Sequence, residues 1–197
     1  MMSKPTIDTS TLSIISNKKL RCDKTGSRFL VYVVMLMTKN VQFSDLIIDN
    51  IYLGNYIDSS SEEFIKRANI NVIINCTKDS LFYFNEREVK YKYRIPVDDD
   101  RQENSMFIMF RYLFNIVDII RFHVMRGDHI YVHCHAGMQR SACVVAAYLI
   151  RYYKMTPQEA VYFIRNKRPI AFTPFINFQK SLDNYYMKIK RENNNNC

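Results

Sequence analysis

The fold of this chain follows from one stretch, Val132-His133-Cys134-His135-Ala136-Gly137-Met138-Gln139-Arg140-Ser141. An apolar strand leads into it and an apolar helix follows it. In α/β proteins, a loop at the carboxyl end of a strand is the usual place for a ligand. Its N–H groups and the positive end of the next helix converge on one point and favour an anion. Gly137 permits backbone geometry that a side chain would obstruct.

A cysteine stands at the mouth of this predicted anion site. The thiol of a free cysteine has a pKa of about 8.5, and helix N-termini and nearby cations lower it to ~3.5–7.5. We therefore expect Cys134 to be a thiolate at neutral pH and to act as a nucleophile toward phosphorus. We expect Ser141 to donate a hydrogen bond to the sulfur and help it leave, and His133 to order the loop rather than transfer protons.

An arginine six positions after the cysteine returns to the same loop. The planar fork of the Arg140 guanidinium matches two phosphate oxygens, which a lysine cannot match in the same way. The other expected phosphate contacts come from the loop itself, at His135, Ala136, Gly137, Met138 and Gln139. No metal and no cofactor are expected, because this loop already supplies positive charge.

Composition places the chain among globular proteins, with 48% apolar residues in 197. The short apolar run Phe29–Met37 is well below the ~18 residues that a membrane helix needs, so no membrane span is expected. The net charge is +9, and residues 1–40 hold seven Lys and Arg against two Asp. Such charge attracts phosphorylated partners, nucleic acid or anionic membrane alike, and cannot choose among them.

The cysteines favour a reducing compartment. The chain has five, and they are Cys22, Cys76, Cys134, Cys143 and Cys197. No pair has the close spacing of a zinc site, and an odd number argues against a disulfide framework. We therefore expect an intracellular, cytoplasmic protein, with the nucleus, or a virion for a viral chain, as alternatives.

The pattern along the chain alternates between strand and helix. Strands are predicted at 46–48, 51–53, 72–74, 93–97 and 130–132, with a turn at Asp49-Asn50 between the first two. Helices are predicted at 62–68, from a cap at 104–105 to 124, at 141–153, from the capping box Thr156-Pro157-Gln158-Glu159 onward, and at 176–190. This alternation predicts an α/β fold with a mostly parallel central sheet flanked by helices.

Three regions follow from these patterns. Residues 1–44 form a basic N-terminal extension with a short apolar segment, for which dimerisation and packing on its own core are both open. Residues 45–190 form the catalytic domain. Residues 191–197 are predicted to be a disordered, Asn-rich tail.

The sequence His133-Cys-x5-Arg-Ser resembles the signature of the protein tyrosine phosphatase superfamily, and of its dual-specificity branch in particular. The resemblance covers about residues 45–188, and the small single-domain form is also similar to the compact poxvirus virion phosphatase. It also rests on Ile51-Tyr52-Leu53-Gly54, Ile74-Asn75-Cys76-Thr77, Ile95-Pro96-Val97-Asp98-Asp99 and Ala147-Tyr148-Leu149-Ile150. It implies the tyrosine phosphatase fold and a phosphocysteine intermediate.

The resemblance also implies a general acid. In the family pattern Ile-Pro-x-x-Asp, the acid falls on Asp99, with Asp98 and Asp100 as neighbours. The tyrosine-only branch uses a Trp-Pro-Asp loop, and this chain has no Trp. We therefore expect phosphoprotein substrates carrying phosphotyrosine and phosphoserine or phosphothreonine.

Other functions share the same kind of loop. Lipid phosphatases often carry lysines in it, which this chain lacks, so a phosphoinositide is less favoured. RNA 5′-triphosphatases usually end it Arg-Thr-Gly, where this chain has Arg140-Ser141-Ala142, so nucleic acid is not favoured either. A non-catalytic phosphoprotein-binding module is the third alternative.

Four further positions carry expectations. The family often has Asn after Thr173-Pro174, where this chain has Phe175, which questions one contact that supports the loop. Lys167 and Arg168 are expected near the pocket edge, either to attract a second phosphate or as a solvated helix end. Cys76 matches a position where some members keep a cysteine that pairs with the nucleophile; a small buried residue is the alternative.

Overall fold

The computed structural model describes residues 43–85 and 87–195, which form one α/β unit. Within them lies a sheet of five strands in the order β1-β2-β5-β3-β4. The predictions for residues 1–42, for Cys22 and for residues 196–197 lie outside the described residues.

The sheet is mostly parallel, as predicted. Its strands are β1 (Ser44–Ile48), β2 (Ile51–Gly54), β3 (Val72–Asn75), β4 (Tyr91–Arg94) and β5 (Ile130–His133). β1 pairs antiparallel with β2, and the pairs β2–β5, β5–β3 and β3–β4 are parallel. Every residue of β3 and β5 is buried, as expected of central strands covered on both faces.

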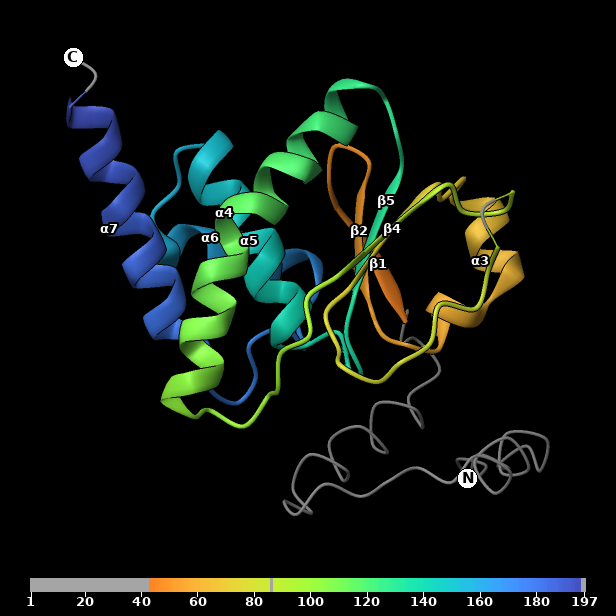
Figure 1. Cartoon of the computed structure of the whole chain (residues 1–197), viewed down its shortest axis with the longest axis horizontal. Helices are drawn as coiled ribbons and strands as arrows, with labels where there is room; N and C mark the ends of the chain where they lie inside the picture. Colours follow the sequence, from red (N-terminus) through yellow and green to blue (C-terminus); the bar gives the residue numbers. More distant parts are fainter. Residues whose placement is uncertain (1–42, 86, 196–197) are drawn as a thin grey trace, which may run out of the picture. The chain divides into compact units, whose positions relative to one another are not determined.

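Helices cover both faces of the sheet (Figure 1). The short η1 (Asp58–Ser60) and α3 (Glu62–Arg67) lie on one face, and α4 (Glu103–Met125), α5 (Arg140–Tyr152), α6 (Pro157–Lys167) and α7 (Gln179–Asn195) lie on the other. α5 is the centre of the second layer, because residues 140–150 are all buried. Among the described helices, none is both long enough and apolar enough to cross a membrane.

Local caps explain several of these boundaries. The predicted capping box is confirmed: Thr156 Oγ1 accepts from Glu159 N, and Glu159 Oε2 accepts from Thr156 N at 2.7 Å. Ser61 caps α3 by accepting a hydrogen bond from Phe64 N. The predicted turn between β1 and β2 is also confirmed, and Asp49 adopts a left-handed φ of 49° in it.

Two predicted boundaries were wrong. β4 ends at Arg94 rather than Val97, because Pro96 has no N–H for a ladder and Val97 N turns back to Ile95 O. α4 begins at Glu103 without a side-chain cap, so Asn104 and Ser105 lie inside the helix rather than capping it.

The last helix also differs from the prediction. α7 begins at Gln179 rather than Ile176 and continues to Asn195, so residues 191–195 are helical rather than disordered. Its buried residues include Leu182, Tyr185 and Ile189, which hold three successive turns against the core. Once such turns exist, each further residue adds a hydrogen bond at little entropic cost, and the helix runs on into the asparagines.

Candidate active site

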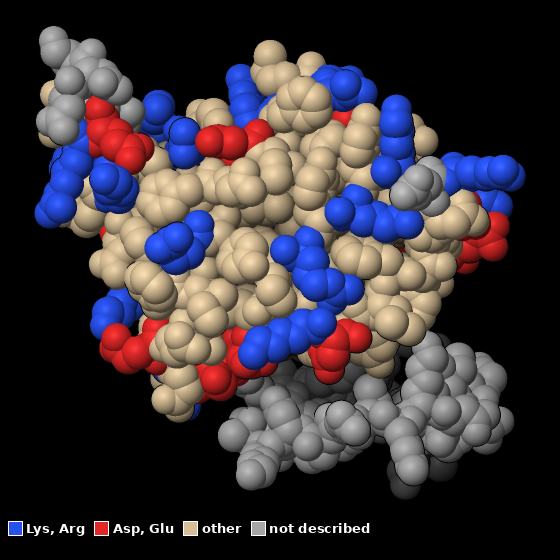
Figure 2. Space-filling view, viewed as in Figure 1, with Lys and Arg blue, Asp and Glu red and all other residues tan. Residues whose placement is uncertain are grey.

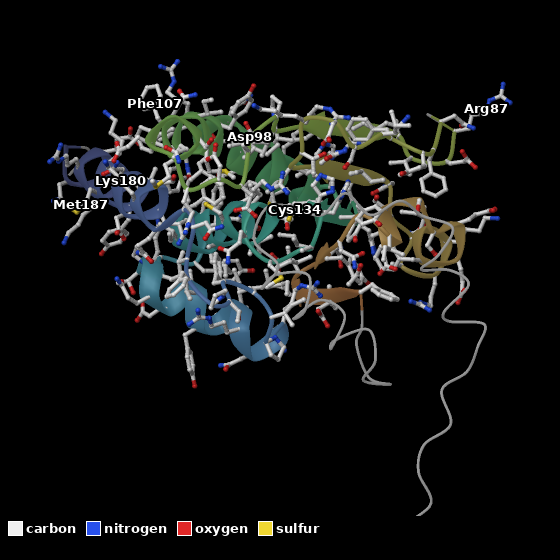
Figure 3. All side chains as sticks on the ribbon, turned by 90° about the horizontal axis from the view of Figure 1, so that it is seen from below. Arg87, Asp98, Phe107, Cys134, Lys180 and Met187 are labelled. Atoms are coloured by element: carbon white, nitrogen blue, oxygen red, sulfur yellow. The ribbon has the colours of Figure 1, made fainter. Side chains whose placement is uncertain are left out.

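The site lies where β5 ends and α5 begins. We call residues 134–140, which join the two elements, the Cys134 loop. Figure 3 looks onto this edge of the sheet, with Cys134 near the centre of the view and Asp98, on the neighbouring aspartate loop (residues 95–102), above it in the view. The parallel pairing of β5 with β2 and β3 explains this position, because the carboxyl ends of all three strands meet there.

Successive carbonyl groups of the Cys134 loop accept hydrogen bonds from groups outside it. The pairs are His135 O with Tyr56 N (3.3 Å), Ala136 O with Arg168 Nη2 (3.3 Å), Gly137 O with Arg168 Nε (2.8 Å) and Met138 O with Phe172 N (2.7 Å). In a trans peptide, the N–H points opposite to the C=O. The N–H groups of residues 136–139 are therefore turned the other way, toward the centre of the loop, where they form a cradle for an anion.

Gly137 is required by this arrangement for two reasons. Its φ of 67° lies in the left-handed region, which side chains disfavour. A Cβ atom there would also collide with the backbone of Gly54 and with the guanidinium of Arg168. The loop thus packs directly on the end of β2.

The Cys134 sulfur lies at the bottom of the cradle. The residue is 1% exposed, and its Sγ accepts hydrogen bonds from Gly137 N at 3.3 Å and Ser141 Oγ at 3.2 Å. Burial raises the pKa of the thiol, but the charge of Arg140 and the hydroxyl and N–H of Ser141 outweigh burial. The net result is a pKa below the ordinary value, which favours the thiolate.

Arg140, the first residue of α5, joins this loop to the aspartate loop. Its Nη1 donates to Val97 O at 3.3 Å, and its Nε lies 3.9 Å from Asp99 Oδ2. The side chain is only 9% exposed, so its charge acts in a poorly solvated place.

The three aspartates have different surroundings. Asp98 is half exposed and pairs with Lys78 at the surface. Asp100 is exposed, and the hydrogen bond from Gln102 N lowers the pKa of its carboxyl group. Asp99 faces inward, at 19% side-chain exposure, toward Arg140. The structure therefore brings Asp99, of the three, to the Cys134 loop.

Two residues that support the site were missed or misplaced by the sequence interpretation. Asn177 Nδ2 donates to Asp99 Oδ1 at 2.5 Å. The Gln139 side chain turns away from the cradle: its Nε2 donates to Thr173 O and Phe175 O, and its Oε1 accepts from Asn177 N. Only the backbone of Gln139 faces the cradle.

The departure at Phe175 is therefore harmless to the loop. Phe175 is 65% exposed, and Asn177, two residues later, provides the amide contact to Asp99. In the sequence, the contact from Asn177 was indicated only by the presence of an Asn near Thr173-Pro174, two positions after the one that the resemblance indicated.

The expectation for Arg168 was wrong. Arg168 is 2% exposed and holds the loop carbonyls and Asp45, so it does not stand at a pocket edge for a second phosphate. Lys167 is exposed and agrees with the alternative, a solvated helix end. The reason is the turn after α6, which directs residue 168 inward.

The remaining predicted residues lie around the same loop. His135 is half exposed at the rim, 3.4 Å from Asp79, and burial followed by the charge of Arg140 lowers the pKa of its imidazole. Ala136 and Met138 are partly buried. His133 is buried and stacks on Tyr131, and burial lowers its pKa to about 3, so its ring is neutral at physiological pH.

Cys76 lies beside the strand that carries the nucleophile. Its N–H donates to His133 O at 2.8 Å, one residue before Cys134. The residue is fully buried with a free thiol, and burial raises the pKa of that thiol well above its usual value.

Comparison with known proteins matches the chain, over residues 51–188, to the family described as the dual specificity phosphatase catalytic domain. It is 33% identical over 140 residues to the tyrosine-protein phosphatase vhp-1 of Caenorhabditis elegans, covering 71% of this chain and 20% of that protein. It is 32% identical over 138 residues to a viral protein named as a tyrosine phosphatase, 123R of Invertebrate iridescent virus 6. This match covers 69% of this chain and 87% of the viral protein.

Among solved structures, human DUSP28 superposes with a TM-score of 0.67 at 22% identity, covering 77% of this chain and 97% of that one. The fold is therefore shared over nearly the whole of that domain. The chain spans about a fifth of the nematode relative, so that protein's other regions have no counterpart in the match.

Proposed function

Because the chain belongs to the dual specificity phosphatase family, we propose that it hydrolyses phosphotyrosine and phosphoserine or phosphothreonine in proteins. One observation carries the proposal. The Cys134 sulfur lies beneath a ring of inward N–H groups, with Arg140 beside it and Asp99 facing that arginine. A nucleophile, an oxyanion cradle and an acid thus converge on one point.

In the first proposed step, the Cys134 thiolate attacks phosphorus in line with the ester oxygen. An S–P bond forms and the P–O bond breaks, with its electron pair going to the leaving oxygen. Asp99 supplies the proton that this oxygen takes up. The inward N–H groups and the Arg140 guanidinium stabilise the charge on the three equatorial oxygens.

In the second step, water attacks the phosphocysteine. The Asp99 carboxylate takes a proton from that water, the P–S bond breaks and inorganic phosphate leaves. The Ser141 hydroxyl, 3.2 Å from Sγ, stabilises the sulfur as it becomes a thiolate again. The same carboxyl group thus serves as acid and then as base.

The protein substrates follow from the family and from the loop. The variable loop positions, His135, Ala136, Met138 and Gln139, add no lysine that would favour an inositol phosphate. On the face shown in Figure 2, Lys and Arg are scattered among other side chains rather than gathered into one basic surface. Neither feature favours an RNA or phosphoinositide substrate.

Further proposals concern the whole chain. The cysteine usage supports a reducing, cytoplasmic location, with the nucleus or a virion as alternatives. The apolar run at 29–37 supports a homodimer through residues 1–44. Light scattering of the full chain, compared with a variant carrying Ser at Val31, Val33 and Val34, tests the dimer, which an unchanged mass would contradict.

The function is tested with wild type, Cys134→Ser and Asp99→Asn, without added metal, on an aryl phosphate and on phosphotyrosine and phosphothreonine peptides. We expect turnover of both peptide types, none with Cys134→Ser, and a loss of about 10²–10⁴-fold with Asp99→Asn. Peptide binding by the wild type without turnover would replace the proposal with a binding module. Aryl turnover with inert peptides would point to RNA or lipid substrates.

A further inference from the structure

A buried arginine holds the Cys134 loop from behind. Arg168, the residue after α6, is 2% exposed, and its guanidinium donates to Gly137 O at 2.8 Å and Ala136 O at 3.3 Å. These two bonds keep both carbonyls turned outward. They therefore aim the N–H groups of Gly137 and Met138 into the cradle, because N–H and C=O are opposed across a peptide.

This arginine is itself held by a carboxylate from a strand much earlier in the chain. Arg168 Nη1 lies 2.6 Å from Asp45 Oδ2, a separation of 123 residues in the sequence. Asp45 belongs to β1, and its side chain is 19% exposed. A buried guanidinium requires such a counter-charge, since an unpaired buried charge is strongly unfavourable.

The strand that carries Asp45 is fixed in the same place by other bonds. The neighbouring Ser44 hydroxyl lies 2.9 Å from Tyr131 Oη, and Tyr131 donates to Asn55 O at 2.6 Å. β1 also pairs with β2, whose last residue, Gly54, packs against Gly137. Asp45 is therefore presented to Arg168 by a rigid edge of the sheet.

We propose that Asp45 is a positioning residue for the reaction, acting through Arg168 to set the direction of the N–H groups in the Cys134 loop. The proposal rests on the proposed function for the reaction that it supports. Without this carboxylate, the Arg168 guanidinium loses the ion pair that fixes its position across both carbonyls. The two peptide planes then rotate, and Gly137 N no longer reaches the Cys134 sulfur or a bound oxyanion.

This role predicts effects that a loss of stability alone does not produce. Fewer inward N–H groups weaken the binding of a free oxyanion, which needs no turnover. Loss of the Gly137 hydrogen bond also raises the pKa of Cys134, so alkylation of its thiolate moves to higher pH. Both readouts stay valid if the protein proves inactive on every substrate, which separates this proposal from the proposed function.

The test uses Asp45→Ala, Asp45→Asn and Asp45→Glu in the full chain. Inorganic tungstate affinity is measured by calorimetry, and the pH dependence of iodoacetate labelling is followed on the Cys134 peptide by mass spectrometry. We expect Asp45→Ala to weaken tungstate binding by about 10-fold or more, which corresponds to the loss of one charge-assisted contact. The affinity of Asp45→Asn should be intermediate, and that of Asp45→Glu should be closest to wild type.

A matched control is Asp128→Asn. Asp128 has a similarly shielded carboxylate (11% exposed), bound to His123 and Arg126 before β5 begins, at the opposite end of that strand from Cys134. The Asp128→Asn variant should have a lower melting temperature but an unchanged tungstate affinity and an unchanged pH dependence of Cys134 labelling. Asp45 variants that melt lower yet bind tungstate and label like wild type would overturn the proposal. If Asp45→Ala does not fold, the same two measurements on Asp45→Asn, which retains a hydrogen-bond acceptor, decide whether the proposal holds.

Discussion

Asn177 donates a hydrogen bond from its side-chain amide to the carboxylate of Asp99, with 2.5 Å between Nδ2 and Oδ1. The N–H of the same residue donates to Gln139 Oε1 at 3.0 Å. The aspartate loop and the Cys134 loop are thus joined through one asparagine. Its position decides where the proposed acid stands relative to the nucleophile.

Asn177→Ala should therefore reduce kcat by on the order of 10- to 100-fold and change KM much less, because a misplaced acid slows the reaction without weakening substrate binding. The loss should be large for phenyl phosphate, whose leaving oxygen needs a proton, and small for a nitrophenyl phosphate. Steady-state kinetics on both esters measures it. Asn115→Ala, an exposed asparagine on α4, is the control, and equal losses on both esters would contradict the acid-positioning role.

Gln139→Met should have a related effect, because it keeps the volume of the side chain and removes its three hydrogen bonds. Two carbonyl groups then lose their donor, which we expect to cost about 1–3 kcal/mol of unfolding free energy in denaturant. In a double-mutant cycle with Asn177→Ala, the rate losses should be less than additive, since both variants release the same link. Fully additive losses would show that the two residues act separately.

Ser141→Ala should shift the pH dependence of the reaction. The Ser141 hydroxyl helps to lower the pKa of Cys134, so its removal raises that pKa. Because the thiolate is the reactive form, the acidic limb of kcat/KM should move to higher pH. A pH profile on an aryl phosphate measures the shift. A slower release of phosphate from the intermediate, seen as a pre-steady-state burst, should accompany it; an unchanged limb would exclude the hydroxyl as a cause of the low pKa.

His133 should make the fold sensitive to acid. Its pKa is about 3 in the folded protein and near 6.5 when unfolded. Below pH 6.5 the unfolded chain therefore binds a proton that the folded chain does not, and stability falls as the pH drops toward 3, by up to ~5 kcal/mol. His133→Phe removes this contribution, so its unfolding free energy relative to wild type should improve steadily from pH 7 to pH 4 in urea titrations. A constant difference would show that His133 does not titrate on unfolding.

Cys76 and Cys134 should form a disulfide after oxidation. Peroxide oxidises the Cys134 thiolate to a sulfenic acid and releases hydroxide. The Cys76 thiol then attacks this sulfur and displaces water to form the S–S bond. Activity should return with dithiothreitol in wild type and be lost irreversibly in Cys76→Ser, where Cys134 oxidises further. Peptide mapping detects the linked pair, and an equal recovery of activity by both proteins would contradict this prediction.

The order of residues alone was enough to predict the contacts around the Cys134 sulfur. Cys134, Gly137 and Ser141 lie within seven positions of one another, so their contacts depend on one strand, one tight loop and one helix start. The parallel sheet was also predictable, because strand and helix patterns alternate along the chain. Such features are local, and each follows from short-range geometry.

The partners that support this chemistry came only from the tertiary structure. Asp99 meets Asn177 across 78 positions, and Arg168 meets Asp45 across 123. Each pair depends on how β1, α6 and the loop before α7 are packed against the sheet, and a change of one residue in register would part them. The sequence pattern therefore placed Arg168 at a solvent edge, whereas packing buried it behind the loop that it holds.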